Sequence, residues 1–453
     1  MASSYEQMNG PQVADSSTAE DWPSSRSAWW AVAVLTFTYL VAFADRQILA
    51  LLVEPLKHSL GLTDTQISLL QGFAFGAFYT LLGVPIGRLI DSSNRRNVVA
   101  AGCFLWCLAT SMSGFAHGFG YLFVARMAVG IGEATVSPGA LSILSDYFPA
   151  PRRALPISIY IAGASVGAGA ALLAGASILT LAGYVARHFM PSWQALESWR
   201  LVFVLVGAVG LVAVLLLMSV AEPARRGVKT SGTPPWRELA HFLRVRARLF
   251  GPHFAGFALC STVGYGLLAW APTFLIRAHH WSAAKVGLTL GLVIAAMGVA
   301  GVLAGGALAT RWRRQGRKDS AFRAATWGVC GVVAPAALAP LVTNTEVSIV
   351  LFGLAVFCLT FASGVSAASL QEVTPNRLRA QTSAIYFFAI NFIGVGLGPL
   401  HIALITDYVF GNELRVASSL VLSALVLGPL SGYLMIRALR EYPRWQMVAE
   451  GQH

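Results

Sequence analysis

Arg126-Met-Ala-Val-Gly-Ile-Gly-Glu133 places an arginine and a glutamate inside one long apolar segment, residues 121–147. Seven residues make about two helical turns, so both charges would lie on one helix face, roughly 10 Å apart along the axis. A charge in hydrocarbon costs about 2.5–3.5 kcal/mol by insertion scales, so neither side chain is expected to face lipid. A second apolar segment carries Asp45-Arg46. We expect these four charges to face an internal, wet cavity; a static ion network that pins the helices together is the alternative.

The composition indicates a membrane protein. Of 453 residues, 56% are hydrophobic and only 11% are charged, against about 25% charged in soluble proteins. The segments long enough to cross about 30 Å of hydrocarbon predict an all-α membrane protein with twelve transmembrane helices, at 29–54, 66–89, 97–116, 121–147, 155–182, 200–221, 253–277, 284–309, 321–342, 346–373, 380–406 and 415–437.

The distribution of basic residues predicts the topology. With twelve crossings, most of the 32 lysines and arginines fall on the side of the two termini. This positive-inside bias predicts a multi-pass protein of the inner (plasma) membrane with both termini in the cytoplasm. The net charge of +12 is therefore expected to meet anionic lipid headgroups, and nucleic acid is not an expected partner.

The chain is expected to divide into two six-helix bundles. Residues 222–250 form a basic cytosolic linker between bundles 29–221 and 251–438, and 236–250 is compatible with a short basic helix on the inner leaflet. Residues 1–28, which lack the features of a signal peptide, and 439–453 are expected to be cytosolic tails, the first of them disordered.

The two bundles share a repeat. Arg153-Ala-Leu-Pro-Ile-Ser-Ile-Tyr160 matches Arg379-Ala-Gln-Thr-Ser-Ala-Ile-Tyr386 at an offset of 226, the difference between 379 and 153. Parallel duplication with a binding site between the halves suits a rocking transporter.

The cysteines show no paired spacing, so neither disulfides nor a metal site is expected; they are Cys103, Cys107, Cys260, Cys330 and Cys358. The chain has no nucleotide-binding loop and no paired catalytic carboxylates, so we expect no enzyme activity and no cofactor.

A polar turn closes the second predicted helix. Gly87-Arg88-Leu-Ile-Asp91-Ser-Ser-Asn94-Arg95-Arg96 resembles the Gly-x-x-x-Asp-Arg-x-Gly-Arg-Lys/Arg signature of the major facilitator superfamily. It departs at Ser92 and Asn94, and Thr310 takes the aspartate position in the second half. We expect Asp91 to latch the cytosolic side of the outward-open state, together with the gating arginines Arg88, Arg95, Arg96, Arg152 and Arg153.

Within that superfamily the chain resembles the spinster-like transporters. The resemblance rests on Ala44-Asp45-Arg46-Gln47, Glu54-Pro55, the stretch from Arg126 to Ser137, and Ser145-Asp146-Tyr147-Phe148-Pro149. Eukaryotic members of that family move lysophospholipids or sphingoid phosphates, and the equivalents of the four membrane charges line their cavity. The short termini and loops are typical of a bacterial member.

The four charges have expected roles. Desolvation favours a neutral carboxyl and a nearby arginine favours a charged one, so Glu133 is expected to take up a proton when its arginine leaves. Asp45 and Arg126 are expected to share in this proton coupling, Arg126 pairing with either carboxylate. Arg46 remains as the spare cation for an anionic substrate. Further substrate contacts are expected at Tyr160, Tyr265, Trp270, Thr273, Tyr386 and Asn391, although packing is the commoner role of any one aromatic.

The sequence therefore predicts a monomeric, proton-coupled secondary transporter for an amphipathic anion such as a lysolipid or sphingoid-like lipid. A proton-linked symporter or exporter of a small organic anion, such as a sugar acid or carboxylate, is the alternative within the class. A non-transporting membrane sensor or scaffold is the alternative outside it. An apolar lateral opening would favour lipid, and a small, polar, sealed site would favour the small anion.

Overall fold

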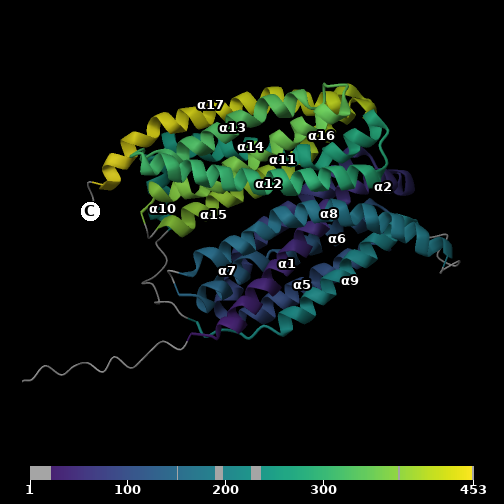
Figure 1. Cartoon of the computed structure of the whole chain (residues 1–453), viewed down its shortest axis with the longest axis horizontal. Helices are drawn as coiled ribbons and strands as arrows, with labels where there is room; N and C mark the ends of the chain where they lie inside the picture. Colours follow the sequence, from purple (N-terminus) through teal and green to yellow (C-terminus); the bar gives the residue numbers. More distant parts are fainter. Residues whose placement is uncertain (1–21, 150–151, 189–196, 226–235, 376–377, 451–453) are drawn as a thin grey trace, which may run out of the picture.

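The computed structural model describes residues 22–149, 152–188, 197–225, 236–375 and 378–450. Over these ranges the chain is helical, and it forms two bundles that lie side by side (Figure 1). The N-terminal half contains α1 (Ser25–Leu51), α2 (Val53–Leu60), α3 (Asp64–Ser68), η1 (Leu69–Phe73), α4 (Ala74–Ser92), α5 (Arg95–Ser113), α6 (Phe119–Glu133), α7 (Val136–Tyr147), α8 (Ala154–His188) and α9 (Ser198–Met218).

The C-terminal half begins with the short helix α10 of the basic linker. It contains α10 (Trp236–Val245), α11 (Ala247–His279), α12 (Ala283–Arg314), α13 (Ser320–Leu338), α14 (Thr345–Glu372), α15 (Arg379–Ala389), η5 (Ile390–Val395), α16 (Gly396–Leu404), η6 (Ile405–Phe410), η7 (Glu413–Arg415) and α17 (Val416–Glu450). The segments η1, η5 and η6 are π-helical.

Eleven spans in the described ranges are long and apolar enough to cross a membrane. The predicted segment 97–116 is the exception: it forms the 19-residue helix α5, which starts with Arg95, Arg96 and Asn97 and is less apolar than the others. It still packs along α6 and α9. The all-helical membrane fold is confirmed, with α5 completing the N-terminal bundle.

Two predicted boundaries differ from the structure. Helix α1 starts at Ser25, where the Ser24 side chain accepts a hydrogen bond from the Ser27 backbone N–H at 3.3 Å. Helix α17 continues through most of the predicted tail 439–453, because Tyr442 is buried against the C-terminal bundle and donates a hydrogen bond to Glu372.

The repeat appears as a matching hydrogen bond from an arginine side chain to a backbone carbonyl in each half. The Nε of Arg153 donates to the carbonyl of Phe148 at 2.7 Å, and the Nε of Arg379 donates to the carbonyl of Thr374 at 3.1 Å. Both the donors and the acceptors are related by the offset of 226 found in the sequence. Each contact secures the turn that leads into the fifth long helix of its half.

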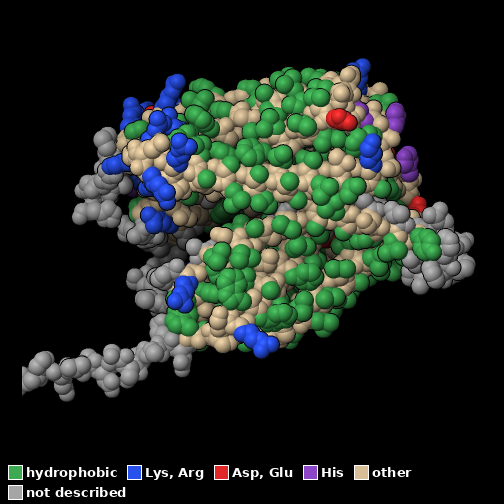
Figure 2. Space-filling model, viewed as in Figure 1, with side chains coloured by type: hydrophobic (Ala, Val, Ile, Leu, Met, Phe, Trp, Pro, Cys, Tyr) green, Lys and Arg blue, Asp and Glu red, His purple; other side chains and the backbone are tan. Residues whose placement is uncertain are grey.

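The two ends of the molecule differ. The start of α1, helix α10 and the end of α17 lie at one end, here called the tail end; α2 and the tip of α16 lie at the other, here called the closed end (Figure 1). Between the halves the surface is indented on the tail-end side (Figure 2).

Glycines bring the halves into backbone contact. A Cβ added to Gly72 of η1 would lie 2.6 Å from the carbonyl oxygen of Val395 and 2.8 Å from that of Gly396. A Cβ added to Gly169 of α8 would lie 2.6 Å from the carbonyl oxygen of Gly291 on α12. These two lines of contact between the halves are here called the Gly72 seam and the Gly169 seam. Each requires a residue without a side chain at the glycine position.

We expect Gly72→Ala to lower the thermal unfolding temperature of the purified protein. The added methyl meets two backbone oxygens that cannot rotate away, and overpacking of this kind costs about 1–3 kcal/mol. Gly83 of α4 is the matched control, since nothing lies within 4 Å of its added Cβ; Gly83→Ala should stabilise the helix by up to about 1 kcal/mol. Equal unfolding temperatures for the two variants would contradict this account of the seam.

Candidate functional site

The four charges form two ion pairs between α1 and α6. Arg126 donates from Nη1 to Asp45 Oδ2 at 3.0 Å, and Thr110 of α5 donates to Asp45 Oδ1 at 2.9 Å. The Nε and Nη2 of Arg46 lie 2.6 and 2.5 Å from the same oxygen of Glu133, Oε2. Arg46 is thus not a spare cation in this state: it takes the carboxylate that the sequence left open to Arg126.

The network is buried but incompletely paired. Asp45, Arg126 and Glu133 are at most 1% exposed, whereas the side chain of Arg46 is 20% exposed. Within the described residues, Glu133 Oε1 and the Nε and Nη2 of Arg126 have no hydrogen-bond partner. Buried polar atoms left unpaired cost about 1–3 kcal/mol each. A network whose only role is to hold helices together is expected to satisfy them, so this arrangement favours a rearranging network over a static one.

Arg46 is surrounded by aromatic rings. Its guanidinium carbon lies 4.3 Å from the ring centroid of Phe75, 4.7 Å from that of Phe43 and 5.1 Å from that of Tyr79. Such cation–π contacts stabilise a cation in a desolvated place. The guanidinium therefore keeps favourable contacts even when Glu133 is not its partner.

Arg46 also lines a pocket between the halves. The N-terminal half contributes the charged and amide side chains, and the C-terminal half contributes a mainly apolar wall that includes Tyr265. The lining residues are Phe43, Arg46, Gln47, Ala50, Gln71 and Phe75, with Tyr265, Leu268, Ala269, Val395 and Pro399 opposite. Arg46 is the charged residue of this lining. One guanidinium thus belongs to both the charge network and the pocket.

Of the other predicted substrate residues, Tyr265 lies at this pocket. Tyr160 is buried in the N-terminal half, stacked on Tyr39 with ring centroids 4.5 Å apart. Tyr386 is buried in the C-terminal half, where it donates to Ser366 Oγ at 2.5 Å. The two repeat tyrosines thus pack within their own bundles in this state.

The remaining three lie on α11 and η5. Trp270 is buried and donates from Nε1 to the carbonyl of Pro399 at 3.1 Å. Thr273, one helical turn further, is also buried. Asn391 donates from Nδ2 to the carbonyl of Phe387 in its own helix at 2.9 Å. None of the three is in the pocket lining with Arg46.

Three of the predicted gating residues, Arg95, Arg96 and Arg153, contact the N-terminal half and the start of the linker. Arg95 is buried, pairs with Asp146, and lies 2.7 Å from Glu222 Oε1 through its Nε. The Arg96 backbone N–H donates to Glu222 Oε2 at 2.9 Å. The exposed members are Arg88, Asp91 and Arg152. Within the part of the chain that the structure describes, Asp91 makes no hydrogen bond or ion pair to the C-terminal half, in keeping with the indentation at the tail end (Figure 2).

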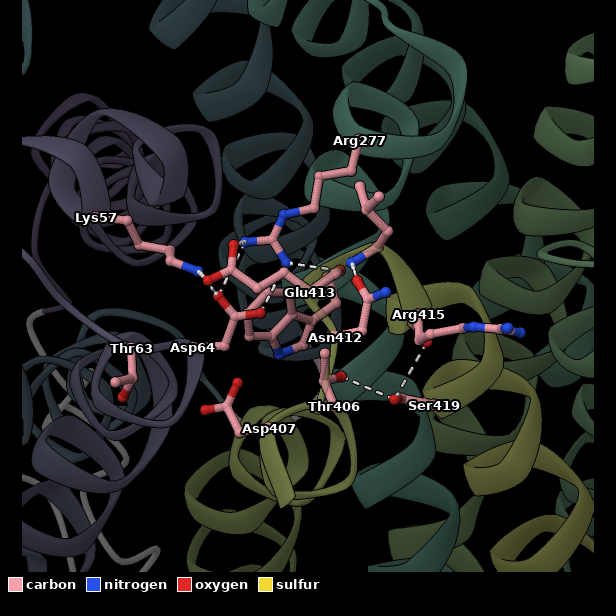
Figure 3. Close-up of polar contacts among 12 residues, drawn as sticks. Lys57, Thr63, Asp64, Arg277, Thr406, Asp407, Asn412, Glu413, Arg415 and Ser419 are labelled. Carbon is pink, nitrogen blue, oxygen red and sulfur yellow. Dashed lines mark hydrogen bonds and ion pairs between the residues drawn. The ribbon is translucent and has the colours of Figure 1, made fainter. Parts of the chain in front are cut away.

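The closed end holds a charge cluster that the sequence analysis missed (Figure 3). Arg277, near the end of α11, donates from Nη1 and Nη2 to the two oxygens of Asp64 at 2.7 and 2.9 Å, and from Nε to Glu54 Oε1 at 2.7 Å. Lys57 Nζ lies 2.5 Å from Asp64 Oδ1 and 2.6 Å from Glu413 Oε1. The cluster therefore joins α2 and α3 of one half to α11 and η7 of the other.

A second contact between the halves lies beside this charge cluster. The backbone N–H and the hydroxyl of Thr65 donate to Asp407 Oδ2 at 2.8 and 2.6 Å. The sequence held one usable signal: Thr63-Asp-Thr-Gln66 forms a capping box, which marks a helix start at Asp64. The partner residues lie more than 200 positions away, and no local pattern connects them.

We expect Arg277→Gln to loosen the closed end. The change leaves Asp64, which is fully buried, and Glu54 without this arginine, and breaking a buried pair costs about 3–5 kcal/mol. Spin labels at Tyr121 and Val347, both exposed, should report longer distances after the native cysteines are replaced. Arg415→Gln, which changes an exposed arginine beside Glu413, serves as the control and should leave the distances unchanged. Identical distributions in both variants would mean that the cluster does not hold the end closed.

Known proteins similar to this chain agree on its family. Residues 35–399 match the model of the Major Facilitator Superfamily. An MFS-type efflux pump of Mycolicibacterium smegmatis is 30% identical over 88% of this chain and 89% of its own length, and a probable L-galactonate transporter of Escherichia coli is 24% identical over 83% of each. A bacterial homologue of the human lysosomal transporter spinster, in an inward-facing and unoccupied conformation, shares the fold with a TM-score of 0.77 at 24% identity, over 93% of this chain and 97% of the other. The chain belongs to the Major Facilitator Superfamily and is a secondary transporter, not an enzyme.

Proposed function

We propose that this transporter carries an organic anion in a proton-linked cycle and binds the anionic group at Arg46. The observation that carries the proposal is the double placement of Arg46, which pairs with buried Glu133 and lines the pocket between the halves. An anion in the pocket and the carboxylate of Glu133 compete for one guanidinium.

Charge balance links this competition to a proton. Two arginines and two carboxylates make the network neutral when all four groups are charged. A further anion in a low-dielectric site is unfavourable unless one carboxylate is neutralised. Glu133 Oε1 is free of hydrogen bonds from the described residues, so a proton can bind there without first displacing Arg46. Once Glu133 is neutral, its hold on Arg46 weakens and the substrate anion takes its place.

The position of the pocket links binding to movement of the halves. A ligand held by Arg46 on α1 would contact Tyr265 on α11 and Pro399 on α16, and so would contact both halves at once. Ligands shift a two-state equilibrium by their different affinities for the two states. Rocking of the halves about a site at their interface is the alternating-access mechanism that duplicated transporters use.

We further propose that the tail end faces the cytoplasm, which makes this state inward-open. Basic side chains gather over the tail end of the C-terminal half (Figure 2). They come from α10, the start of α11, α12, the loop after α12, and α17, and include Arg237, Arg244, Arg248, Arg311, Arg313, Arg314, Arg317, Lys318, Arg437 and Arg440. The positive-inside rule places such residues in the cytoplasm. The protein would then act as a monomer in the inner (plasma) membrane.

A compact acid is the cargo that the pocket supports best. Both seams between the halves are closed at backbone contacts, through Gly72 with Val395 and through Gly169 with Gly291. Polar side chains form one face of the pocket. A partly polar site whose lateral seams are closed at these two glycines favours a small organic anion such as a sugar acid over a lipid.

A lysolipid or sphingoid-like lipid remains the second candidate. Large apolar side chains are exposed on α4 and α15 toward the tail end, namely Leu81, Val84, Phe387 and Phe388. They belong to the helices that flank the Gly72 seam, and would give an acyl chain a lateral path. The charge network speaks against a non-transporting sensor or scaffold, which has no need of buried charged groups with unpaired polar atoms.

Glu133→Gln is expected to remove the pH dependence of anion binding. Because binding requires a neutral Glu133, wild-type affinity should be high at low pH and fall as the pH rises, by up to about tenfold per pH unit for one linked proton. Glutamine mimics the protonated carboxyl, so the variant should bind tightly throughout. Titrations of purified protein with a panel of organic acids and lysolipids would measure this.

Glu346→Gln, which changes an exposed glutamate of α14, is the control and should keep the wild-type pH dependence. Wild-type pH dependence in Glu133→Gln would falsify the assignment of Glu133 as the proton site.

A further inference from the structure

The pocket contains a buried side-chain amide that has no part in the proposed change of partner at Arg46. Gln71 of η1 lines the pocket, and within the described residues neither its Nε2 nor its Oε1 has a hydrogen-bond partner. A buried amide that lacks both its donor and its acceptor contact is unfavourable. A ligand with hydroxyl groups would satisfy both atoms, because each hydroxyl donates one hydrogen bond and accepts others.

Gln71 has polar neighbours in the same lining. Arg46 and Gln47 are consecutive residues of α1, and both line the pocket with Gln71. The opposite wall is mainly apolar, with Leu268, Val395 and Pro399. One face of the pocket therefore offers a cation and two amides, and the other is mainly apolar apart from Tyr265.

The backbone holds Gln71 in this place. It belongs to a π-helical segment, and π-bulges occur frequently at functional sites. The next residue, Gly72, is in backbone contact with Val395 and Gly396 of the other half. Because η1 is fixed against the partner half at Gly72, Gln71 stays at the interface while this end is closed.

We propose that Gln71, assisted by Gln47, is a hydroxyl-binding subsite and that the cargo is a polyhydroxylated carboxylic acid. This inference rests on the proposed binding of the anionic group at Arg46. The carboxylate would lie on Arg46, and hydroxyls along the carbon chain would contact the two amides. The headgroup of a lysolipid also places a hydroxyl near an anion, but the glycine-closed seams beside the pocket favour the free acid.

The test compares acids that differ in their hydroxyls. Purified full-length protein is titrated by calorimetry at acidic pH with D-gluconate, with hexanoate and with 1-oleoyl lysophosphatidate. A site that hydrogen-bonds ligand hydroxyls rejects analogues that lack them, so the wild type should bind gluconate at least about tenfold more tightly than hexanoate. Gln71→Met, of similar size, should weaken gluconate binding by about tenfold or more and leave hexanoate binding unchanged.

Two controls separate the possible failures. Gln315→Met changes an exposed glutamine at the end of α12 and should leave all three affinities unchanged. Arg46→Ala should weaken the binding of every anion. Retained gluconate binding in Arg46→Ala overturns the proposed function, whereas equal effects of Gln71→Met on gluconate and hexanoate overturn only the hydroxyl subsite.

The remaining outcomes also support or overturn the proposed cargo and subsite. Wild-type protein that binds lysophosphatidate but not gluconate contradicts the polyhydroxylated acid as cargo. Should Gln71→Met bind neither acid, Gln47→Met is the second variant: a selective loss of gluconate affinity supports the subsite, and no selectivity overturns it.

Discussion

One guanidinium with two possible partners is the feature on which the rest of this molecule depends. Arg46 lies where a buried carboxylate and an open pocket meet, and it cannot neutralise both Glu133 and a substrate anion. In a low-dielectric interior an unneutralised charge is unfavourable by several kcal/mol. In the proposed cycle, the protonation of Glu133 and the occupancy of the pocket are therefore coupled by electrostatics, without any need for a long-range signal.

The surrounding structure makes this exchange feasible. Aromatic rings keep Arg46 in a favourable environment while it changes partners. The second pair, Asp45 with Arg126, is fully buried and supported by Thr110. In the proposed cycle this pair holds α1 against α6 while Arg46 changes partners.

In the proposed cycle, the contacts at the closed end link the exchange of partners at Arg46 to movement of the halves. The charge cluster around Asp64 and Arg277 joins the halves there, and the Gly72 seam beside it consists of glycine–backbone contacts. Ion pairs can separate and form again in water, whereas the glycine seam allows the halves to approach closely without interlocking side chains. This end can therefore open as the tail end closes.

The sequence was informative where a single segment carries the signal. Apolar length predicted the helices, a match at a fixed offset predicted the repeat, and charges in apolar segments marked Asp45, Arg46, Arg126 and Glu133. Which charged side chains pair between two segments was harder to predict from the sequence. The sequence left Arg126 open to either carboxylate, because the pairing of Glu133 with Arg46 depends on the rotation of α1 against α6.

Contacts between the halves were the hardest to anticipate. Arg277 reads in sequence as one basic residue at a helix end, and its partners Glu54 and Asp64 belong to the other half. Gln71 was overlooked because a glutamine in an apolar run has no distinctive local pattern. Only the π-helical turn and the packing of Gly72 bring it to the pocket.

Proton uptake on ligand binding tests the exchange at Arg46 most directly. Calorimetric titration of the purified protein in two buffers of different ionisation enthalpy counts the protons taken up with the tightest-binding anion. At a pH where Glu133 is charged before binding, the account predicts about one proton taken up per anion bound, and none in Glu133→Gln. Anion binding to the wild type with no proton uptake at any pH would contradict it.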